Sequence, residues 1–170
     1  MTTTTATTAR MLLDTPIGTL TLVGSDAGLR AVLWPTEKAG RVALPDAIAT
    51  VTDHPLLSRA ASQLGEYFDG ARQQFDVPLD LHGTAFQVKV WRSLAEIAYG
   101  TTASYGEQAA RLGDARKARA VGAANGRNPV SIILPCHRVV GADGSLTGFA
   151  GGIDTKRWLL DHERSHADAA

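Results

Sequence analysis

The stretch IILPCHRV, residues 132–139, decides how the rest of the sequence is interpreted, because its apolar run leads directly into the only cysteine of the 170-residue chain. Pro135 fixes the backbone just before Cys136 and removes one amide donor. His137 and Arg138 follow at once. A neighbouring cation or a basic imidazole lowers the pKa of a thiol, and the thiolate is the reactive form. The stretch therefore fits a nucleophilic cysteine, or a cysteine that is only a small buried hydrophobe.

The composition is that of a globular chain, with 44% hydrophobic and 20% charged residues. No apolar run approaches the ~20 residues that a membrane span needs. The opening MTTTTATT has neither the basic start nor the apolar centre of a secretory signal. A single cysteine excludes an intramolecular disulfide, which fits a reducing, cytoplasmic setting. Five scattered histidines and one cysteine show no metal-ligand spacing, so we expect no metal site.

Charge is distributed unevenly although the net charge is zero. Residues 81–140 contain eight Lys or Arg and three Asp or Glu. Residues 1–80 contain six Lys or Arg and nine Asp or Glu, and residues 141–170 contain three Lys or Arg and five Asp or Glu. A basic middle third between acidic flanks suggests a face that meets an anionic partner such as nucleic acid. Local scatter in a neutral protein would give the same pattern, so charge alone leaves both interpretations open.

The first half of the chain predicts a strand-rich lobe. Residues 11–34 read as strands around a Ser-Asp-Ala-Gly turn. Residues 75–81 alternate apolar and polar side chains, which predicts another strand, and Pro78 favours an edge position for it. Between these segments, an apolar residue recurs every fourth position from Pro55 to near Gly70, which predicts an amphipathic helix.

Short helices dominate the second half. Thr84 can cap one helix, and Ser104 with Glu107 has the spacing of a capping box that opens another. Asp114 can cap the next helix, ARKARAVGAA at 115–124. Two short helices joined by a tight Gly-Asp turn are typical of a helix-turn-helix.

The segment 115–124 has a basic beginning and an end of small residues. Arg116, Lys117 and Arg119 lie in its first turns, and only Ala, Val and Gly follow. Small residues let a backbone approach a partner closely. Recognition helices carry their DNA contacts near the N-terminal end, where the cations lie in this segment. A solvated basic face on a core helix is the alternative.

The segments before and after the cysteine also carry structural signals. Residues 130–134 predict a short buried strand before it, and the glycine-rich residues 147–152 form a loop that could wrap a flat ligand or serve only as a connection. Asp154 can cap a last helix, on which His162 and His166 are expected at the surface.

Together these pieces resemble the active-site domain of the O6-alkylguanine-DNA alkyltransferases, also called methylated-DNA–protein-cysteine methyltransferases. The matching segments, in chain order, are GTAFQVKVW (83–91), SYGE (104–107), ARAVG (118–122), NGRNP (125–129), LPCHRVVG (134–141) and GGI (151–153). PCHRV alone is highly specific. The N-terminal half resembles the family only in its strand-rich character and in its TPIGTL opening.

The resemblance implies an α/β (α+β) fold. A ribonuclease-H-like, strand-rich lobe would precede a mainly helical winged helix-turn-helix domain that holds the active site. The expected divisions are a disordered tail at 1–9, the lobe at 10–82, the DNA-binding and alkyl-acceptor domain at 83–163, and a flexible tail at 164–170.

The resemblance also implies DNA repair. The protein would flip O6-alkylguanine out of duplex DNA and move the alkyl group irreversibly to its own cysteine, one group per molecule. Double-stranded DNA with O6-alkylguanine is the implied partner, and O4-alkylthymine is a second candidate lesion; neither cofactor nor metal is implied. We expect a cytoplasmic monomer. A non-catalytic module that binds alkylated DNA is the alternative, although relatives of that kind lack the cysteine. A cysteine hydrolase would need an oxyanion hole, which no segment marks.

Carried over by position, the resemblance assigns the chemistry to five residues. Cys136 would be nucleophile and alkyl acceptor, His137 the base acting through a water, and Glu163 the residue that orients His137. Asn128 would brace the loop that holds the cysteine. Tyr105 would donate a hydrogen bond or proton to the departing guanine.

DNA contacts follow from the same resemblance. An alkyl group on a base edge cannot be reached inside the stack, so the nucleotide must be rotated out. Arg119 would enter the duplex as a finger, while Arg116 and Lys117 would contact phosphates. The base pocket would be lined by Val139, Ala150 and Gly151. Some relatives carry a hydroxyl residue where this chain has Ala150, so only its backbone amide could help to hold O6.

Overall fold

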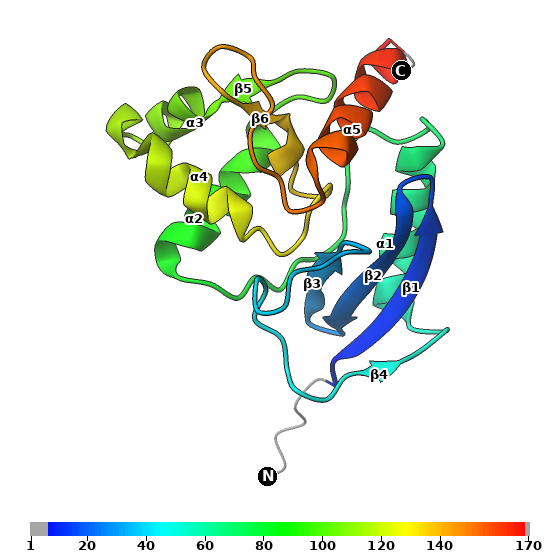
Figure 1. Ribbon diagram of the computed structural model, residues 1–170. Coiled ribbons are helices and arrows are strands. Elements are labelled where there is room, and N and C mark those ends of the chain that lie inside the picture. Colours follow the sequence, from blue (N-terminus) through cyan, green and yellow to red (C-terminus); the bar gives the residue numbers. More distant parts are fainter. Residues whose placement is uncertain (1–6, 169–170) are drawn as a thin grey trace.

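A four-stranded sheet forms the first lobe of the computed structural model, which describes residues 7–168 (Figure 1). Its order is β3-β2-β1-β4. The antiparallel neighbours are β1 (Ala9–Thr15), β2 (Gly18–Ser25) and β3 (Gly28–Leu33), and the short β4 (Ala49–Thr50) pairs in parallel with β1. The turn predicted after Gly24 joins β2 to β3, so the strand-rich lobe is confirmed.

Helix α1 (Pro55–Phe68) packs against this sheet, as its spacing of apolar residues predicts. The side chain of His54 accepts a hydrogen bond from Leu57 N and caps the helix, and Pro55 occupies the first turn, where no amide donor is needed. Leu57 and Leu64 are fully buried. The helix thereby covers one face of the sheet.

The second lobe is mainly helical (Figure 1). In chain order it contains α2 (Ala85–Ser93), η1 (Leu94–Glu96), β5 (Ala103–Ser104), α3 (Tyr105–Arg111), η2 (Ala115–Lys117), α4 (Ala118–Gly126), η3 (Cys136–Arg138), β6 (Val139–Val140) and α5 (Ile153–His166). Complete capping boxes open α2 at Thr84 and α3 at Ser104, and Asp114 accepts a hydrogen bond from Arg116 N at the start of η2. The caps predicted at Thr84, Ser104 and Asp114 are confirmed.

The predicted helix-turn-helix is formed by α3, η2 and α4, which pack against one another. The short strands β5 and β6 pair in parallel beside it. The fold class expected from the sequence, a strand-rich lobe followed by a winged helix-turn-helix, is therefore confirmed.

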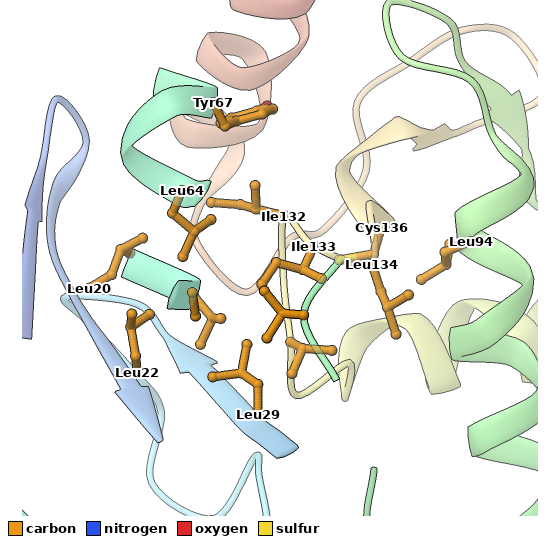
Figure 2. Close-up of a cluster of buried hydrophobic side chains, with 14 of the residues drawn as sticks. Leu20, Leu22, Leu29, Leu64, Tyr67, Leu94, Ile132, Ile133, Leu134 and Cys136 are labelled. Carbon is orange, nitrogen blue, oxygen red and sulfur yellow. The ribbon is translucent and has the colours of Figure 1, made fainter. Parts of the chain in front are cut away.

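One hydrophobic core crosses the boundary between the lobes. Leu20, Leu22 and Leu29 from the sheet face Ile132 and Leu134 from the segment before the cysteine (Figure 2). The backbone continues this contact, because Val32 N donates to Pro129 O at 2.8 Å. The cysteine segment therefore rests directly on the sheet lobe, and packing of that lobe positions it.

Two predicted strands are wrong. Residues 75–81 form no regular strand; only Leu79 bridges to Leu29 at the edge of the sheet. Residues 130–134 form a tight turn in which Ile132 has φ 74°. Residues 130–134 are apolar because they are buried in the core between the lobes, and burial alone does not require extended pairing. In residues 75–81 only Val77 is buried.

The expected limits of the tails also need correction. Ala9 is the first residue of β1 and is buried, and α5 continues to His166, so residues 164–166 are helical. Gly152 precedes α5 as its cap position, and Asp154 lies inside the first turn without capping it. Residues 1–6 and 169–170 of the two expected tails lie outside the described residues.

The two histidines of α5 are not simple surface residues. His162 stacks on Trp158, with ring centroids 4.8 Å apart, and lies 4.5 Å from His166. Both are half-buried against the end of α1. Among the described residues, none of the helices is both long enough and apolar enough to cross a membrane.

Candidate active site

The cysteine loop, residues 131–138, is a tight turn that hydrogen bonds from the Asn128 side chain hold in place. Asn128 is fully buried; its Nδ2 donates to Leu134 O at 2.7 Å, and its Oδ1 accepts from Val130 N at 3.1 Å. Leu134 N also donates to Val130 O at 3.0 Å. The amide thus ties both arms of the turn, at the position where the resemblance expects a brace.

Ile132 adopts a left-handed backbone conformation that β-branched residues rarely accept. Such strain costs roughly 1–3 kcal/mol and persists only where the surrounding structure enforces it. Here the side chain is 1% exposed and packs into the core shared by the two lobes (Figure 2). Core packing therefore fixes the turn that presents the cysteine.

His137 and Glu163 form a fully buried pair behind the cysteine. His137 Nε2 lies 2.6 Å from Glu163 Oε2, and both side chains have no exposed surface. His137 Nδ1 is buried and has no hydrogen-bond partner among the described residues. The structure therefore pairs His137, the residue directly after Cys136, with Glu163 and leaves the second ring nitrogen of the histidine available.

Two further residues complete this cluster: the sequence suggested Arg138 only as a cation beside the thiol, and it suggested no role for Tyr67. Arg138 clasps the carboxylate of Glu163, with Nε 2.8 Å from Oε1 and Nη2 3.1 Å from Oε2, and its Nη1 donates to Ile97 O. The hydroxyl of Tyr67 donates to Oε2 at 2.7 Å. Arg138 belongs to the motif PCHRV. Tyr67 gave only a weak signal, a phenol on the apolar face of a helix, where a buried hydroxyl needs a partner.

The electrostatics of the cluster favour a neutral histidine beside a carboxylate. Burial alone would raise the pKa of Glu163, but the hydrogen bonds and charges of His137 and Arg138 outweigh it and lower that pKa to about 2. Burial lowers the pKa of His137, and its contact with Glu163 offsets this only in part. At neutral pH, His137 is therefore able to accept a proton.

The thiol itself is not activated in this state. Burial raises the pKa of Cys136, and the nearby Asn128 side chain and the charges of Arg41 and Lys156 compensate incompletely. The expectation that neighbouring basic groups lower this pKa is wrong, because the thiol is only 7% exposed and desolvation dominates. A thiolate must be produced during the reaction, by a base.

A cavity of about 20 Å³ lies over Cys136. Its walls come from α3, α4, the glycine-rich loop and α5, and include Tyr105, Gly122, Asn125, Phe149, Ala150 and Lys156. The Tyr105 hydroxyl lies 2.9 Å from Thr147 Oγ1 and joins the loop to α3 across it. The space holds about one water, far less than the volume of a nucleobase.

Not every residue expected to line the pocket does so. Ala150 and Tyr105 do, whereas Val139 and Gly151 do not. Val139 is fully buried, and its carbonyl accepts a hydrogen bond at 2.6 Å from the buried Lys156 Nζ. Gly151 lies against the ring of Trp34, where a Cβ would come within 2.8 Å of the indole. Val139 and Gly151 therefore pack behind the residues that line the cavity.

The basic residues lie on the recognition helix, residues 115–126 (η2 and α4), and they are exposed. Arg116 pairs with Asp114 at 3.1 Å, and Lys117 Nζ lies 5.8 Å from the centre of the Phe86 ring. Arg119 makes no ion pair within the part of the chain that the structure describes. Gly122, three residues after Arg119 on the same helix, lines the cavity over Cys136.

Among the described residues, no cluster of three or more His, Cys, Asp or Glu side chains could hold a metal ion.

Comparison with known proteins covers almost the whole chain. Residues 9–81 match the model of the "6-O-methylguanine DNA methyltransferase, ribonuclease-like domain", and residues 85–165 match that of the "6-O-methylguanine DNA methyltransferase, DNA binding domain". Both halves, including the N-terminal lobe whose sequence carried little signal, are thus similar to parts of one family.

Individual relatives agree. The methylated-DNA--protein-cysteine methyltransferase of Mycobacterium tuberculosis (strain H37Rv) is 49% identical over 92% of this chain and 93% of that protein. The protein of the same name from Mycolicibacterium paratuberculosis is 46% identical over the same shares. The crystal structure of Mycobacterium tuberculosis OGT in complex with DNA superimposes with a TM-score of 0.84, at 46% identity, over 93% of this chain and 94% of that one.

Proposed function

Since this chain belongs to the 6-O-methylguanine DNA methyltransferase family, we propose that it repairs O6-alkylguanine in duplex DNA by moving the alkyl group to Cys136. As a member, it is a DNA-binding methyltransferase that transfers the group to a cysteine of its own. Cys136 is the only cysteine in the sequence. The observation that carries the proposal is the buried His137–Glu163 pair next to that cysteine.

The base in this scheme is His137. Its pKa is lowered by burial, so the ring is neutral at the pH of the cell. Glu163 accepts from Nε2, which leaves Nδ1 as the proton acceptor. One bridging water between the sulfur and Nδ1 would complete the path, because neighbouring residues in a chain seldom face each other directly. The carboxylate then stabilises the imidazolium as it forms.

The transfer balances without any co-reactant. A bond forms between Sγ of Cys136 and the alkyl carbon, and the bond from that carbon to O6 breaks. Guanine departs with the electron pair, and the Tyr105 hydroxyl donates the hydrogen bond or proton that neutralises it. The net change moves one proton from the thiol to guanine and leaves a thioether. Because no step regenerates the thiol, each molecule reacts once.

The recognition helix supplies the access to the base. Rotating a nucleotide out of the stack costs a few kcal/mol. Arg119 is exposed, unpaired among the described residues and followed by small residues, which supports a role in filling the space that the base leaves. Gly122 and Asn125 of the same helix border the cavity over Cys136. A base that leaves the duplex beside Arg119 thus enters the cavity once the glycine-rich loop opens.

The rest of the account belongs to the same proposal. O6-alkylguanine in double-stranded DNA is the substrate, O4-alkylthymine a second one, and the protein acts as a monomer in the cytoplasm. Arg116 and Lys117 contact phosphates, where long exposed cations contribute most.

Intact-mass and peptide mass spectrometry after incubation with O6-methylguanine duplex DNA tests the proposal. We expect one stable methyl addition per molecule, located on Cys136, and stoichiometric loss of the lesion. Binding without a mass change would indicate the non-catalytic module instead. Repeated turnover without a lasting mass change would indicate a hydrolase.

A further inference from the structure

The carboxylate of Glu163 receives donors from both lobes. From the helical lobe come His137, the guanidinium of Arg138, and Gly100 N, which lies 3.4 Å from Oε1. From the described part of the sheet lobe comes only Tyr67, which lies 96 residues before Glu163 in the chain. A single hydroxyl of α1 therefore reaches the relay proposed for the reaction.

Tyr67 and His137 share one oxygen atom. Oε2 of Glu163 lies 2.7 Å from the Tyr67 hydroxyl and 2.6 Å from His137 Nε2. Two short hydrogen bonds to one carboxylate oxygen compete for the same electron density. The Tyr67 hydroxyl therefore weakens the pull of Glu163 on the proton of His137 while it fixes the direction of Oε2.

The phenol is held rigidly in this position. Tyr67 is fully buried. Its ring makes edge contacts with Phe68 and Tyr99, with centroids 5.3 and 6.2 Å away, and lies 5.4 Å from His162. Burial and the neighbouring carboxylate raise the pKa of Tyr67 far above its usual value, so the hydroxyl keeps its proton. Tyr67 is thus a permanent donor.

We propose that Tyr67 is a positioning residue for alkyl transfer, through which the sheet lobe sets how strongly Glu163 attracts the proton of His137. The inference rests on the proposed function, because the relay matters only if His137 is the base. The groups that face Glu163 are His137 and Arg138 from η3, Tyr67 from α1, and Tyr99 with Gly100 N from the segment before β5. His162 faces Tyr67 from α5.

Tyr99 offers a matched control. It is the same residue type, lies against Tyr67 and close to the same carboxylate, and its buried hydroxyl has no hydrogen-bond partner among the described residues. Tyr67→Phe and Tyr99→Phe remove the same atom, but only the first removes a hydrogen bond to Glu163. A purely structural effect of losing a buried hydroxyl would act in both.

The experiment measures the pKa of His137 by ¹⁵N NMR titration of the full chain. Losing a neutral hydrogen bond to the carboxylate is expected to raise that pKa by roughly 0.5 to 1 unit in Tyr67→Phe and to leave it unchanged in Tyr99→Phe. The acid limb of the single-turnover rate against pH should move upward by the same amount. No shift in Tyr67→Phe, or an equal shift in Tyr99→Phe, would overturn the inference.

Labelling with 3-fluorotyrosine in the Tyr99→Phe background provides a second test that preserves shape. The fluorinated phenol is a stronger donor, so the pKa of His137 should fall, and the same labelling in Tyr67→Phe should not lower it. A fall in both backgrounds, or in neither, would count against Tyr67. The titration does not depend on transfer: if the unaltered protein fails to accept methyl groups, the proposed function fails while the Tyr67 link is still measured.

Discussion

The cysteine loop and the recognition helix serve one reaction but are built in opposite ways. Every residue from Ser131 to Val140 is buried, and the charged groups there are paired, with Glu163 held by His137, Arg138 and Tyr67. On the recognition helix, Arg116, Lys117 and Arg119 are exposed. One region has its geometry fixed in the protein alone, whereas we propose that the other completes its contacts only on DNA.

The difference teaches where stability and function are coupled. In the cysteine loop, the groups that we assign to bond making also hold the two lobes together, so most substitutions there should affect both rate and folding. On the recognition helix, exposed cations contribute little to folding, so substitutions there should affect DNA binding alone.

The largest effect is expected from Cys136→Ser, the one change in the cysteine loop that should separate rate from folding. The hydroxyl is similar in size but a far weaker nucleophile at its usual pKa, so transfer should be abolished. DNA affinity and the free energy of unfolding should change little. Single-turnover assays and duplex titrations measure both quantities. Any transfer above background would remove Cys136 from the account.

Glu163→Gln should show the coupling directly. It leaves Arg138 buried without its counter-ion, which typically costs about 3–5 kcal/mol in free energy of unfolding. Loss of the partner of His137 should also slow transfer by roughly a hundredfold or more. Urea denaturation and single-turnover rates measure the two effects. Asp161→Asn, an exposed carboxylate on the same helix, is the control and should change neither.

The stability of the buried cluster should fall in acid through two groups. The pKa of Glu163 is lowered to about 2 in the folded protein, so its contribution is present above the ordinary value of 4.5 and is lost as pH falls toward 2. The shift corresponds to roughly 3 kcal/mol. The pKa of His137 is also lowered, so the unfolded chain binds a proton first as pH falls below 6.5. Urea denaturation from about pH 7 to about pH 3 measures the loss. In Glu163→Gln the loss below about pH 4.5 should be smaller; an unchanged slope there would contradict the assignment.

The smallest effects are expected on the recognition helix. Arg116→Ala and Lys117→Ala should each lower the slope of log affinity against log salt by about 0.9, the value for one phosphate contact. Thermal stability should stay the same, because the Arg116–Asp114 pair is exposed. Arg59→Ala, an exposed cation of the sheet lobe, is the control. A loss of stability without a change in slope would place these residues in folding rather than in DNA binding.

Local signals allowed most helices to be predicted from the sequence. The caps at Thr84, Ser104 and Asp114 depend on neighbours within three residues, and all three form. Residues 75–81 alternate apolar and polar side chains, yet only Leu79 bridges to the sheet, so alternation was mistaken for a strand. Residues 130–134 were mistaken for a strand because a buried segment is apolar whether or not it pairs. Periodicity cannot separate the two cases when burial comes from the other lobe.

The candidate site was predictable to a similar extent. A motif of adjacent residues marked Cys136 and His137, and the resemblance added Glu163. Tyr67 could not be assigned, because its hydrogen bond spans the two lobes and nothing in the sequence near it announces a carboxylate partner. The raised pKa of Cys136 was equally hidden, since it arises from desolvation by residues distant in the chain.

The central claim, that the recognition helix delivers the base and the cysteine loop breaks the bond, can be tested with one pair of rates. Single-turnover transfer is measured on O6-alkylguanine in duplex DNA and on the free alkylated base, for Arg119→Ala and Glu163→Gln. The account predicts that Arg119→Ala slows the duplex reaction strongly and the free-base reaction much less, whereas Glu163→Gln slows both by the same factor. Equal slowing of both substrates by Arg119→Ala would contradict the account, because Arg119 would then support the pocket or the fold.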